Sequence, residues 1–213
     1  MASRAAILRG LSVYKRFLKR LFDLILGSTL FLLSLPLLLT CILLLYFSGR
    51  RVFFFQERPG YRGKVFKIYK LCTMDEIYDS TGKLLPDEER LTPLGAIIRK
   101  LSLDEVPQLI NVIKGEMSLV GPRPLLTDYL ELYGDYEARR HEVPPGITGL
   151  AQIKGRNATT WRRRFKYDVF YVDHLSFFFD LKILYLTFFK VLSTTGVASR
   201  GRVGIEPFKG FNS

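Results

Sequence analysis

Two adjacent carboxylates, Asp104 and Glu105, stand in the otherwise apolar stretch LSLDEVPQL at residues 101–109. Carboxylates in such a pair can divide labour, because one can attack a phosphorus atom and both can hold a hard cation such as Mg²⁺ through oxygen. A plainer interpretation also exists, since Ser102 to Glu105 matches the S-x-x-E capping box of a helix N-terminus. Alone, the stretch favours a helix start over a catalytic site.

Pro107 indicates where this helix begins. If Ser102 were the N-cap, Pro107 would lie beyond the positions where a missing N–H is harmless. If Asp104 is the N-cap, the proline falls in the first turn and is tolerated. We therefore expect a helix beginning at Asp104, which places both carboxylates at the positive helix end, where phosphates are also attracted.

Three arginines could complete a phosphate site around these carboxylates. Arg99 lies five residues before Asp104, Arg123 stands between two prolines, and Arg156 follows a glycine in KGRN. The planar guanidinium fork matches phosphate. Each arginine alone is more commonly a solvated surface charge, but three of them in Pro/Gly-framed segments make a phosphate site more plausible.

Composition bounds the class of protein. The chain has 213 residues, enough for one domain of ordinary size, and a formal charge of +12. Such a charge suggests nucleic acid, a membrane surface or a phosphorylated substrate as partner. The mean hydropathy is +0.12 although 24% of the residues are charged, so the apolar residues must be gathered in blocks. We expect no nucleic-acid partner, because one such block has 24 uncharged residues.

That block, residues 24–47, is long enough to cross a membrane, since about 20 apolar helical residues span the hydrocarbon core. Pro36, near its middle, should kink the helix, and the hydroxyl of Ser34 could satisfy a carbonyl that the proline frees. Basic residues flank both ends, and positive residues prefer the cytoplasmic side. The residues leave two alternatives open: a kinked span, or a re-entrant helix that enters and leaves by one face.

Two further segments suit a membrane surface. Lys19, Arg20 and Asp23 precede the block as an interfacial anchor, and Lys19 and Asp23 have the i,i+4 spacing of a helical ion pair. The aromatic run 175–192 contains Asp180, which counts against a span. It is either a helix lying in the interface or a buried core helix.

The rest of the chain predicts a helix-rich α+β fold. Strand-like runs at 52–56 and 64–71 are separated by ERPGYRG, which is typical of a hairpin. Helical patterns cover 94–101 and the stretch from the acidic pair to Gly115. The Pro/Gly-rich segments GPRP and VPPGITGLAQIKGRN are expected to be ordered loops.

Several longer motifs occur in order between about Phe17 and Gly196: FLKRLFD, FQERPG, KVFKIYKL, LSLDEVPQL, NVIKGEMSLVGPRPLL, PPGITGLAQIKGRN and DLKILYLTFFKVL. Together they resemble the monotopic phosphoglycosyl transferases, the bacterial sugar transferases that begin glycoconjugate assembly. They are most similar to the small enzymes that initiate protein N-glycosylation in Campylobacter and its relatives.

The resemblance implies a reaction. A UDP-sugar donates its phosphosugar to polyprenyl phosphate, giving polyprenyl-diphospho-sugar and UMP. Asp104 matches the family nucleophile, which attacks the β-phosphate to form an acyl phosphate, and Glu105 matches the residue that helps it hold Mg²⁺. The candidate substrate contacts are Lys70, Arg99, Arg123, Gln152, Arg156 and Asn157.

The resemblance also implies a monotopic architecture, with a re-entrant helix broken at Ser34 and Pro36 and with interfacial amphipathic helices. Residues 1–51 would form the membrane helix and its basic flanks, and residues 52–213 a catalytic domain. UDP-sugars are cytosolic, so the site is expected at the cytoplasmic face of the bacterial inner membrane. The expected partners are UDP-sugar, polyprenyl phosphate and membrane lipid. The resemblance favours an N-acetylated UDP-sugar, but which sugar it is and the oligomeric state stay open.

Two departures from the family pattern stand out. Leu35 separates Ser34 from Pro36, which the family usually places side by side. Cys72 stands where the family usually carries Lys or Arg, and Lys70 is the candidate to replace that charge. The alternative class of function is a peripheral membrane scaffold that binds anionic lipid through its basic face.

Overall fold

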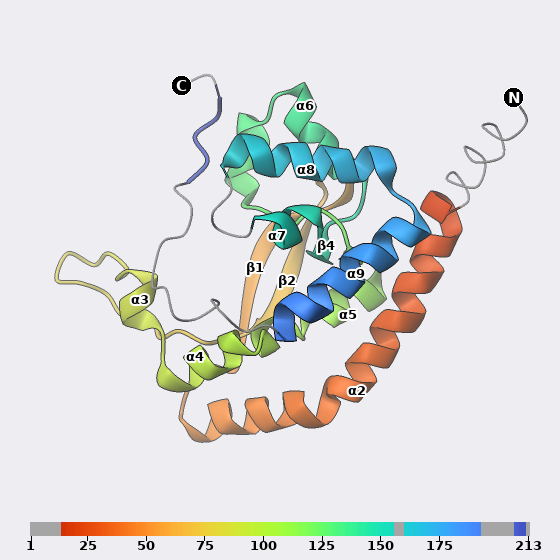
Figure 1. Cartoon of the computed structure of the whole chain (residues 1–213). Helices are drawn as coiled ribbons and strands as arrows, with labels where there is room; N and C mark the ends of the chain where they lie inside the picture. The colour runs from red at the N-terminus through yellow and green to blue at the C-terminus, as the bar shows by residue number, and fades with distance from the viewer. Residues whose placement is uncertain (1–13, 156–159, 193–206, 212–213) are drawn as a thin grey trace, which may run out of the picture.

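Helices and two small sheets make up this fold, as the helix-rich α+β prediction requires. The computed structural model describes residues 14–155, 160–192 and 207–211 (Figure 1). Its longer helices are α2 (Lys19–Phe47), α4 (Pro93–Lys100), α5 (Gln108–Lys114), α8 (Trp161–His174) and α9 (Phe177–Leu192). Shorter helices and turns are η1 (Tyr14–Leu18), η2 (Tyr61–Gly63), α3 (Asp87–Arg90), η3 (Leu103–Glu105), η4 (Thr127–Leu132), α6 (Asp135–Ala138), η5 (Arg139–Glu142) and α7 (Leu150–Lys154).

The predicted hairpin is confirmed. Strands β1 (Phe53–Pro59) and β2 (Val65–Leu71) pair in antiparallel fashion, and η2 forms the turn between them. Side chains alternate across a strand, and Phe66 and Ile68 of β2 are buried. Lys70 shares their face, so it extends from the core side of the sheet toward the segment that carries the two carboxylates.

The second sheet was not predicted. Strands β3 (Ser118–Val120) and β4 (Gly146–Thr148) form a parallel pair; β3 ends just before GPRP, and β4 lies within VPPGITGLAQIKGRN, which we expected to be a loop. Each has three residues, too few for an alternating pattern to show in the sequence. Their junction requires glycine, because a Cβ on Gly146 would lie 2.0 Å from the backbone nitrogen of Gly121.

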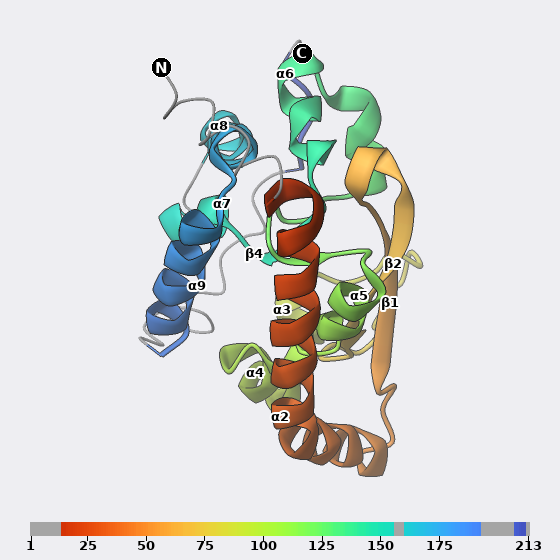
Figure 2. The same ribbon diagram turned by 90° about the vertical axis from the view of Figure 1, so that its right-hand side faces the viewer.

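Helix α2 bends near its middle in both views (Figures 1 and 2). Pro36 lies inside it, and the Ser34 hydroxyl donates to the Phe31 carbonyl at 2.9 Å. Ser34 therefore satisfies a neighbouring carbonyl and not that of Leu32, the carbonyl four residues before the proline. Among the described residues α2 is the one helix long and apolar enough to cross a membrane by length and composition.

The N-terminal end of α2 is anchored by buried charges. The Lys19 ammonium lies 2.7 Å from Asp180 of α9 and 3.9 Å from Asp23, which confirms the i,i+4 pair but shows that its closer partner is Asp180. The Tyr14 and Tyr171 hydroxyls also donate to Asp180. Lys19 and Asp23 are 4% and 3% exposed, so they do not lie on an outer surface but join α2 to the protein interior.

The same end of α2 also contacts backbone groups of β3 and α5. Asp23 accepts a hydrogen bond from the backbone N–H of Leu119 at 3.0 Å. The Arg20 guanidinium donates to the carbonyls of Val112 and Ile113 near the end of α5, where free carbonyls attract a cation. These bonds fix the direction of α2 relative to β3 and α5.

Helix α9 is buried on one face, as a core helix would be, and exposed on the other. Asp180 and Ile183 are fully buried. On its outer side Phe178, Tyr185 and Phe188 are exposed. One face of α9 thus belongs to the core, while an aromatic face remains on the surface.

Candidate functional site

The two carboxylates lie in η3, between α4 and α5, and not at the start of an α-helix. The expected helix start at Asp104 is wrong, because α5 begins at Gln108. Pro107 has no N–H to donate to the Leu103 carbonyl four residues back, so the chain forms a single 3-10 turn first. The capping box does not form either: Ser102 has a positive φ of 56° and its side chain makes no cap bond.

The turn that carries the carboxylates rests on the second arm of α2. Leu103 and Val106 flank the pair and pack against an apolar cluster formed by Leu38, Cys41, Leu45, Leu71 and Ile98. The apolar helix therefore supports the site directly.

Glu105 is held by two cations. The Lys70 ammonium donates to its Oε1 at 2.8 Å, and the Arg123 guanidinium donates to Oε1 at 2.5 Å and to Oε2 at 3.3 Å. Burial alone would raise the pKa of Glu105, but the charges and hydrogen bonds of Arg123 and Lys70 lower it well below its usual range. Glu105 is therefore ionised and fixed in orientation.

Asp104 has the opposite environment. Within the described ranges its carboxylate accepts no hydrogen bond. Burial and then the charge of Glu105 raise its pKa, while Lys70, Arg99 and Arg123 partly oppose this. Its oxygens are free to react, and a raised pKa makes a carboxylate more nucleophilic. Two neighbouring carboxylates with divergent environments are typical of a catalytic pair.

Arg99 reaches the site because α4 is fixed against the end of β2. The helix is capped by the Thr92 hydroxyl, which accepts a hydrogen bond from the N–H of Gly95 at 2.9 Å. A Cβ on Gly95 would lie 2.0 Å from the Thr73 carbonyl oxygen, so only glycine allows this approach. At the other end of α4, Arg99 Nε donates to the Thr73 hydroxyl at 2.8 Å.

Arg123 lies three residues after the end of β3, and its loop is tied to the β4 segment. The N–H of Gly121 donates to the Thr148 carbonyl, and the N–H of Gly146 donates to the Pro122 carbonyl, both at 2.9 Å. The prolines before and after Arg123 restrict the backbone further. The small parallel sheet thus presents the guanidinium that holds Glu105.

The structure brings five predicted residues together, namely Lys70, Arg99, Asp104, Glu105 and Arg123. Gln152 lies in α7, where both polar atoms of its side chain are buried without a hydrogen-bond partner among the described residues. Among the described residues it forms no side-chain hydrogen bond with either carboxylate. Arg156 and Asn157 lie outside the described residues.

Two groups near the site were missed from the sequence. Thr73 holds Arg99, and Arg140 donates to the Arg123 carbonyl at 2.6 Å. Neither belongs to a pattern that the sequence alone marks as functional. The Cys72 thiol donates a hydrogen bond to the Met74 carbonyl at 3.3 Å. Lys70, the candidate to replace the missing basic residue, donates to Glu105.

The donor set bears on the expected magnesium ion. In the part of the chain that the structure describes, no three His, Cys, Asp or Glu side chains gather in a metal site. Asp104 and Glu105 offer two carboxylates, and the Glu105 oxygens already contact Lys70 and Arg123. This set suits Mg²⁺, which usually takes one or two carboxylates and completes its shell with water and substrate phosphates.

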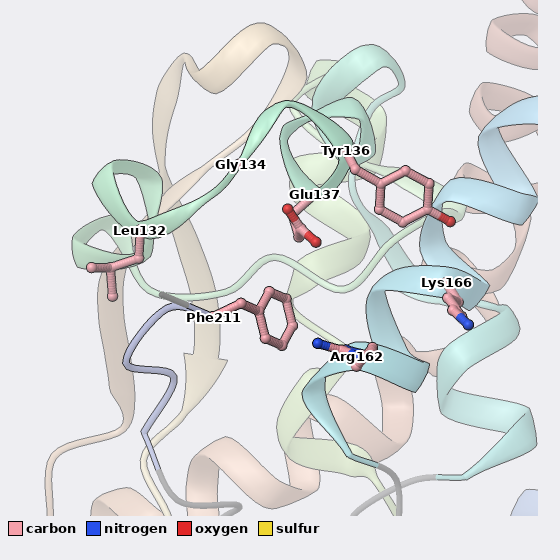
Figure 3. A pocket seen from close by; sticks show the side chains of 7 residues that line it. All are labelled: Leu132, Gly134, Tyr136, Glu137, Arg162, Lys166 and Phe211. Atoms are coloured by element: carbon pink, nitrogen blue, oxygen red, sulfur yellow. The ribbon is translucent and has the colours of Figure 1, made fainter. Parts of the chain in front are cut away.

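A hollow lies elsewhere, between α6, α8 and the segment 207–211. It encloses about 460 Å³ and is lined by Tyr136, Glu137, Arg162, Lys166 and Phe211, among others (Figure 3). Neither carboxylate lines it. The candidate site is therefore identified by its chemistry and not by the size of a cavity.

Comparisons with known proteins agree with this chemistry. Residues 14–194 match the family described as bacterial sugar transferase. The chain is 57% identical over 196 residues to the sugar transferase EpsL of Bacillus subtilis, covering 91% of this chain and 96% of that protein. It is 42% identical over 187 residues to the exopolysaccharide production protein ExoY of Rhizobium meliloti, covering 79% and 83% of the two chains.

A longer relative carries a more specific name. The chain is 39% identical over 183 residues to the UDP-glucose:undecaprenyl-phosphate glucose-1-phosphate transferase of Klebsiella pneumoniae, covering 81% of this chain but 39% of that protein. The matched family covers most of the chain and includes the carboxylate pair and the cations around it. The protein belongs to the bacterial sugar transferase family.

Proposed function

We propose that the protein transfers a phosphosugar from a UDP-sugar to undecaprenyl phosphate and releases UMP. The relative from Klebsiella pneumoniae is named for a reaction of this kind. The observation that carries the proposal is the division between the two carboxylates: Asp104 accepts no hydrogen bond among the described residues, whereas Lys70 and Arg123 hold Glu105. One is free to react while its neighbour is fixed.

The proposed chemistry has two steps. A carboxylate oxygen of Asp104 attacks the β-phosphorus of the UDP-sugar, the bond from that phosphorus to the bridging oxygen breaks, and UMP leaves with the bonding electrons. A phosphate oxygen of undecaprenyl phosphate then attacks the phosphorus of the acyl phosphate and displaces the Asp104 carboxylate. The enzyme returns to its starting state, and ping-pong kinetics follow.

The surrounding cations offset the charge that this reaction concentrates. Lys70, Arg99 and Arg123 face the carboxylate pair from β2, α4 and the loop after β3. They lower the repulsion between a carboxylate nucleophile and a diphosphate. When bound by Asp104 and Glu105, Mg²⁺ would supply further neutralisation of the diphosphate.

The membrane arrangement is part of the proposal. We place the bend of α2 at Pro36 within the membrane, so that the helix re-enters the cytoplasmic face of the bacterial inner membrane, and the exposed aromatic face of α9 at the interface. In support, the second arm of α2, which carries Leu38, Cys41 and Leu45, packs against the turn that holds the carboxylates, and Phe178 is 81% exposed. This places a cytosolic donor and a lipid phosphate at one site.

The end product is a separate question. The sequence motifs resemble the small enzymes of Campylobacter-type N-glycosylation, whereas the relative ExoY is named for exopolysaccharide production. We propose glycoconjugate assembly as the class of pathway, with protein glycosylation as the narrower prediction. A panel of N-acetylated and non-acetylated UDP-sugars identifies the donor, and we expect an N-acetylated one to be preferred.

UMP release tests the function directly. Purified protein, Mg²⁺, undecaprenyl phosphate and a panel of UDP-sugars should yield UMP with at least one donor, and Asp104→Asn should abolish it. The matched control is Asp128→Asn, at an exposed aspartate outside the site. Without acceptor, wild type should retain label from a donor radiolabelled in the β-phosphate. No UMP from any donor, or full turnover by Asp104→Asn, would refute the proposal.

A further inference from the structure

All three guanidinium nitrogens of Arg140 form hydrogen bonds inside the protein. It lies in η5 and is 2% exposed. Its Nε donates to the Asp168 carboxylate of α8 at 3.1 Å, and Nη1 donates to the Tyr133 hydroxyl at 3.2 Å. The remaining nitrogen, Nη2, donates to the backbone carbonyl of Arg123 at 2.6 Å and lies 2.9 Å from Asp168.

Aromatic side chains enclose this group. The guanidinium carbon lies 5.8 Å from the ring centre of Tyr133 and 5.6 Å from that of Phe165. Phe208, from the C-terminal segment, packs on both rings at 5.9 and 5.1 Å. With little water nearby, hydrogen bonds from the guanidinium are stronger and more directional.

Stability alone does not account for such a group. Removing two charges from water is costly, and a buried ion pair often stabilises a fold no better than apolar residues of the same volume. A guanidinium differs from an apolar replacement in one respect here, because it grips the Arg123 carbonyl. That carbonyl belongs to the residue whose side chain holds Glu105.

The backbone around Arg123 converts this grip into an orientation. On the β4 side, the Gly146 N–H holds the Pro122 carbonyl at 2.9 Å. On the α8 side, Arg140 holds the next carbonyl along the chain. Two consecutive carbonyls fixed from opposite partners leave the peptide planes little rotation, so the Arg123 side chain leaves the loop in a set direction.

We propose that Arg140, held by Asp168 and Tyr133, is a positioning residue for the transferase reaction: it fixes the Arg123 backbone so that the Arg123 guanidinium meets Glu105. The inference rests on the proposed function for its kinetic consequence, but its structural part does not. A displacement of a catalytic group by about 1 Å can cost about 10²-fold in rate. Loss of the Arg140 grip should therefore reduce kcat by about 10- to 100-fold.

The test uses Arg140→Lys, which keeps the charge but loses the fork, and Tyr133→Phe, which removes a single hydroxyl. The control is Arg139→Lys, the neighbouring residue, whose exposed side chain pairs with Asp173 and Glu142. UMP release should show the loss mainly in kcat, with KM for the UDP-sugar changed less than about threefold, because the grip affects orientation and not donor contact. The control should match wild type.

A double-variant cycle separates positioning from general damage. If Arg140 acts through Arg123, then Arg123→Gln combined with Arg140→Lys should be no slower than Arg123→Gln alone. Losses that multiply, or wild-type kcat in folded Arg140→Lys, overturn the proposal. If Arg140→Lys shows no cooperative melting transition, Tyr133→Phe takes its place in the same cycle with the same criteria.

Hydrogen exchange supplies a readout that needs no turnover. The peptide spanning residues 118–126 should exchange faster in Arg140→Lys than in wild type and unchanged in Arg139→Lys. If wild type releases no UMP, the proposed function fails, and the exchange result alone decides the positioning: faster exchange in Arg140→Lys supports it, and equal exchange overturns it.

Discussion

The buried pair of Lys19 and Asp180 gives the sharpest stability prediction. Asp180 is fully buried and accepts hydrogen bonds from Lys19, Tyr14 and Tyr171 at 2.7, 2.6 and 2.7 Å. Asp180→Asn keeps the shape but removes the charge, which leaves the Lys19 ammonium buried with weaker partners. The substitution should destabilise the protein markedly.

The size of the effect follows from what remains around Lys19. Removing one partner of a buried ion pair costs about 3–5 kcal/mol. Lys19 keeps the Val120 carbonyl at 3.1 Å and Asp23 at 3.9 Å, so the lower end of that range applies. At about 2–4 °C per kcal/mol for a protein of this size, a loss of about 3 kcal/mol lowers Tm by about 6–12 °C.

Thermal unfolding in detergent micelles, followed by circular dichroism, measures this change. The control is Arg51→Gln, which breaks the exposed pair with Glu76 and should alter stability by less than about 1 kcal/mol. Because Lys19 and Asp180 act on each other, Lys19→Met combined with Asp180→Asn should be no less stable than Lys19→Met alone. A Tm for Asp180→Asn within 2 °C of wild type would refute the reasoning.

Three further predictions concern pH, backbone contact and topology. Burial and then the Arg140 charge lower the pKa of His141 from 6.5 to about 4, so the unfolded chain binds the proton more readily and stability should fall by up to about 3 kcal/mol as pH drops from 6.5 to 4. Denaturant titrations should show a flatter dependence in His141→Gln than in wild type. Gly95→Ala places a Cβ 2.0 Å from the Thr73 carbonyl oxygen and should cost about 2 kcal/mol or more, read as a lowered Tm. Pro36→Ala restores a backbone N–H and should let α2 straighten, and accessibility labelling should then find the two chain ends on opposite sides of the membrane, whereas wild type should show both on one side.

Local patterns predicted most elements of this fold. The hairpin follows from two β-rich runs around Pro and Gly, and α5 ends at Gly115, where φ is +86°. The parallel pair of β3 and β4 escaped prediction because its stability comes from contacts between segments 28 residues apart, Ser118 with Gly146 and Val120 with Thr148. The helix start at Asp104 failed for a different reason, since the missing N–H of Pro107 delays the α-helix instead of merely being tolerated in it.

In the site, too, local patterns predict some residues, whereas others depend on long-range contacts. The sequence reveals Asp104 and Glu105 because a charged pair is unusual in an apolar run. It reveals Arg123 because an arginine between two prolines is unusual. Arg140 and Asp168 do not, because each lies among other charged residues and only the fold places them together in the interior. Sequence can reveal groups that react, whereas groups that orient them depend on long-range packing.

The segment from Val120 to Arg123 contacts both the apolar helix α2 and helix α8. The Val120 carbonyl, three residues before Arg123, accepts a hydrogen bond from Lys19 of α2 at 3.1 Å. It also lies 2.9 Å from the Tyr171 hydroxyl of α8, which shares its single proton between Val120 and Asp180. Arg123 lies three residues after Val120, and Arg140 donates a hydrogen bond to the Arg123 carbonyl. A shift of α2 relative to α8 must therefore move one end of a short segment whose other end is fixed. Because that segment orients the cation on Glu105, the packing of the apolar helix and the geometry of the carboxylate pair are set by the same few backbone groups.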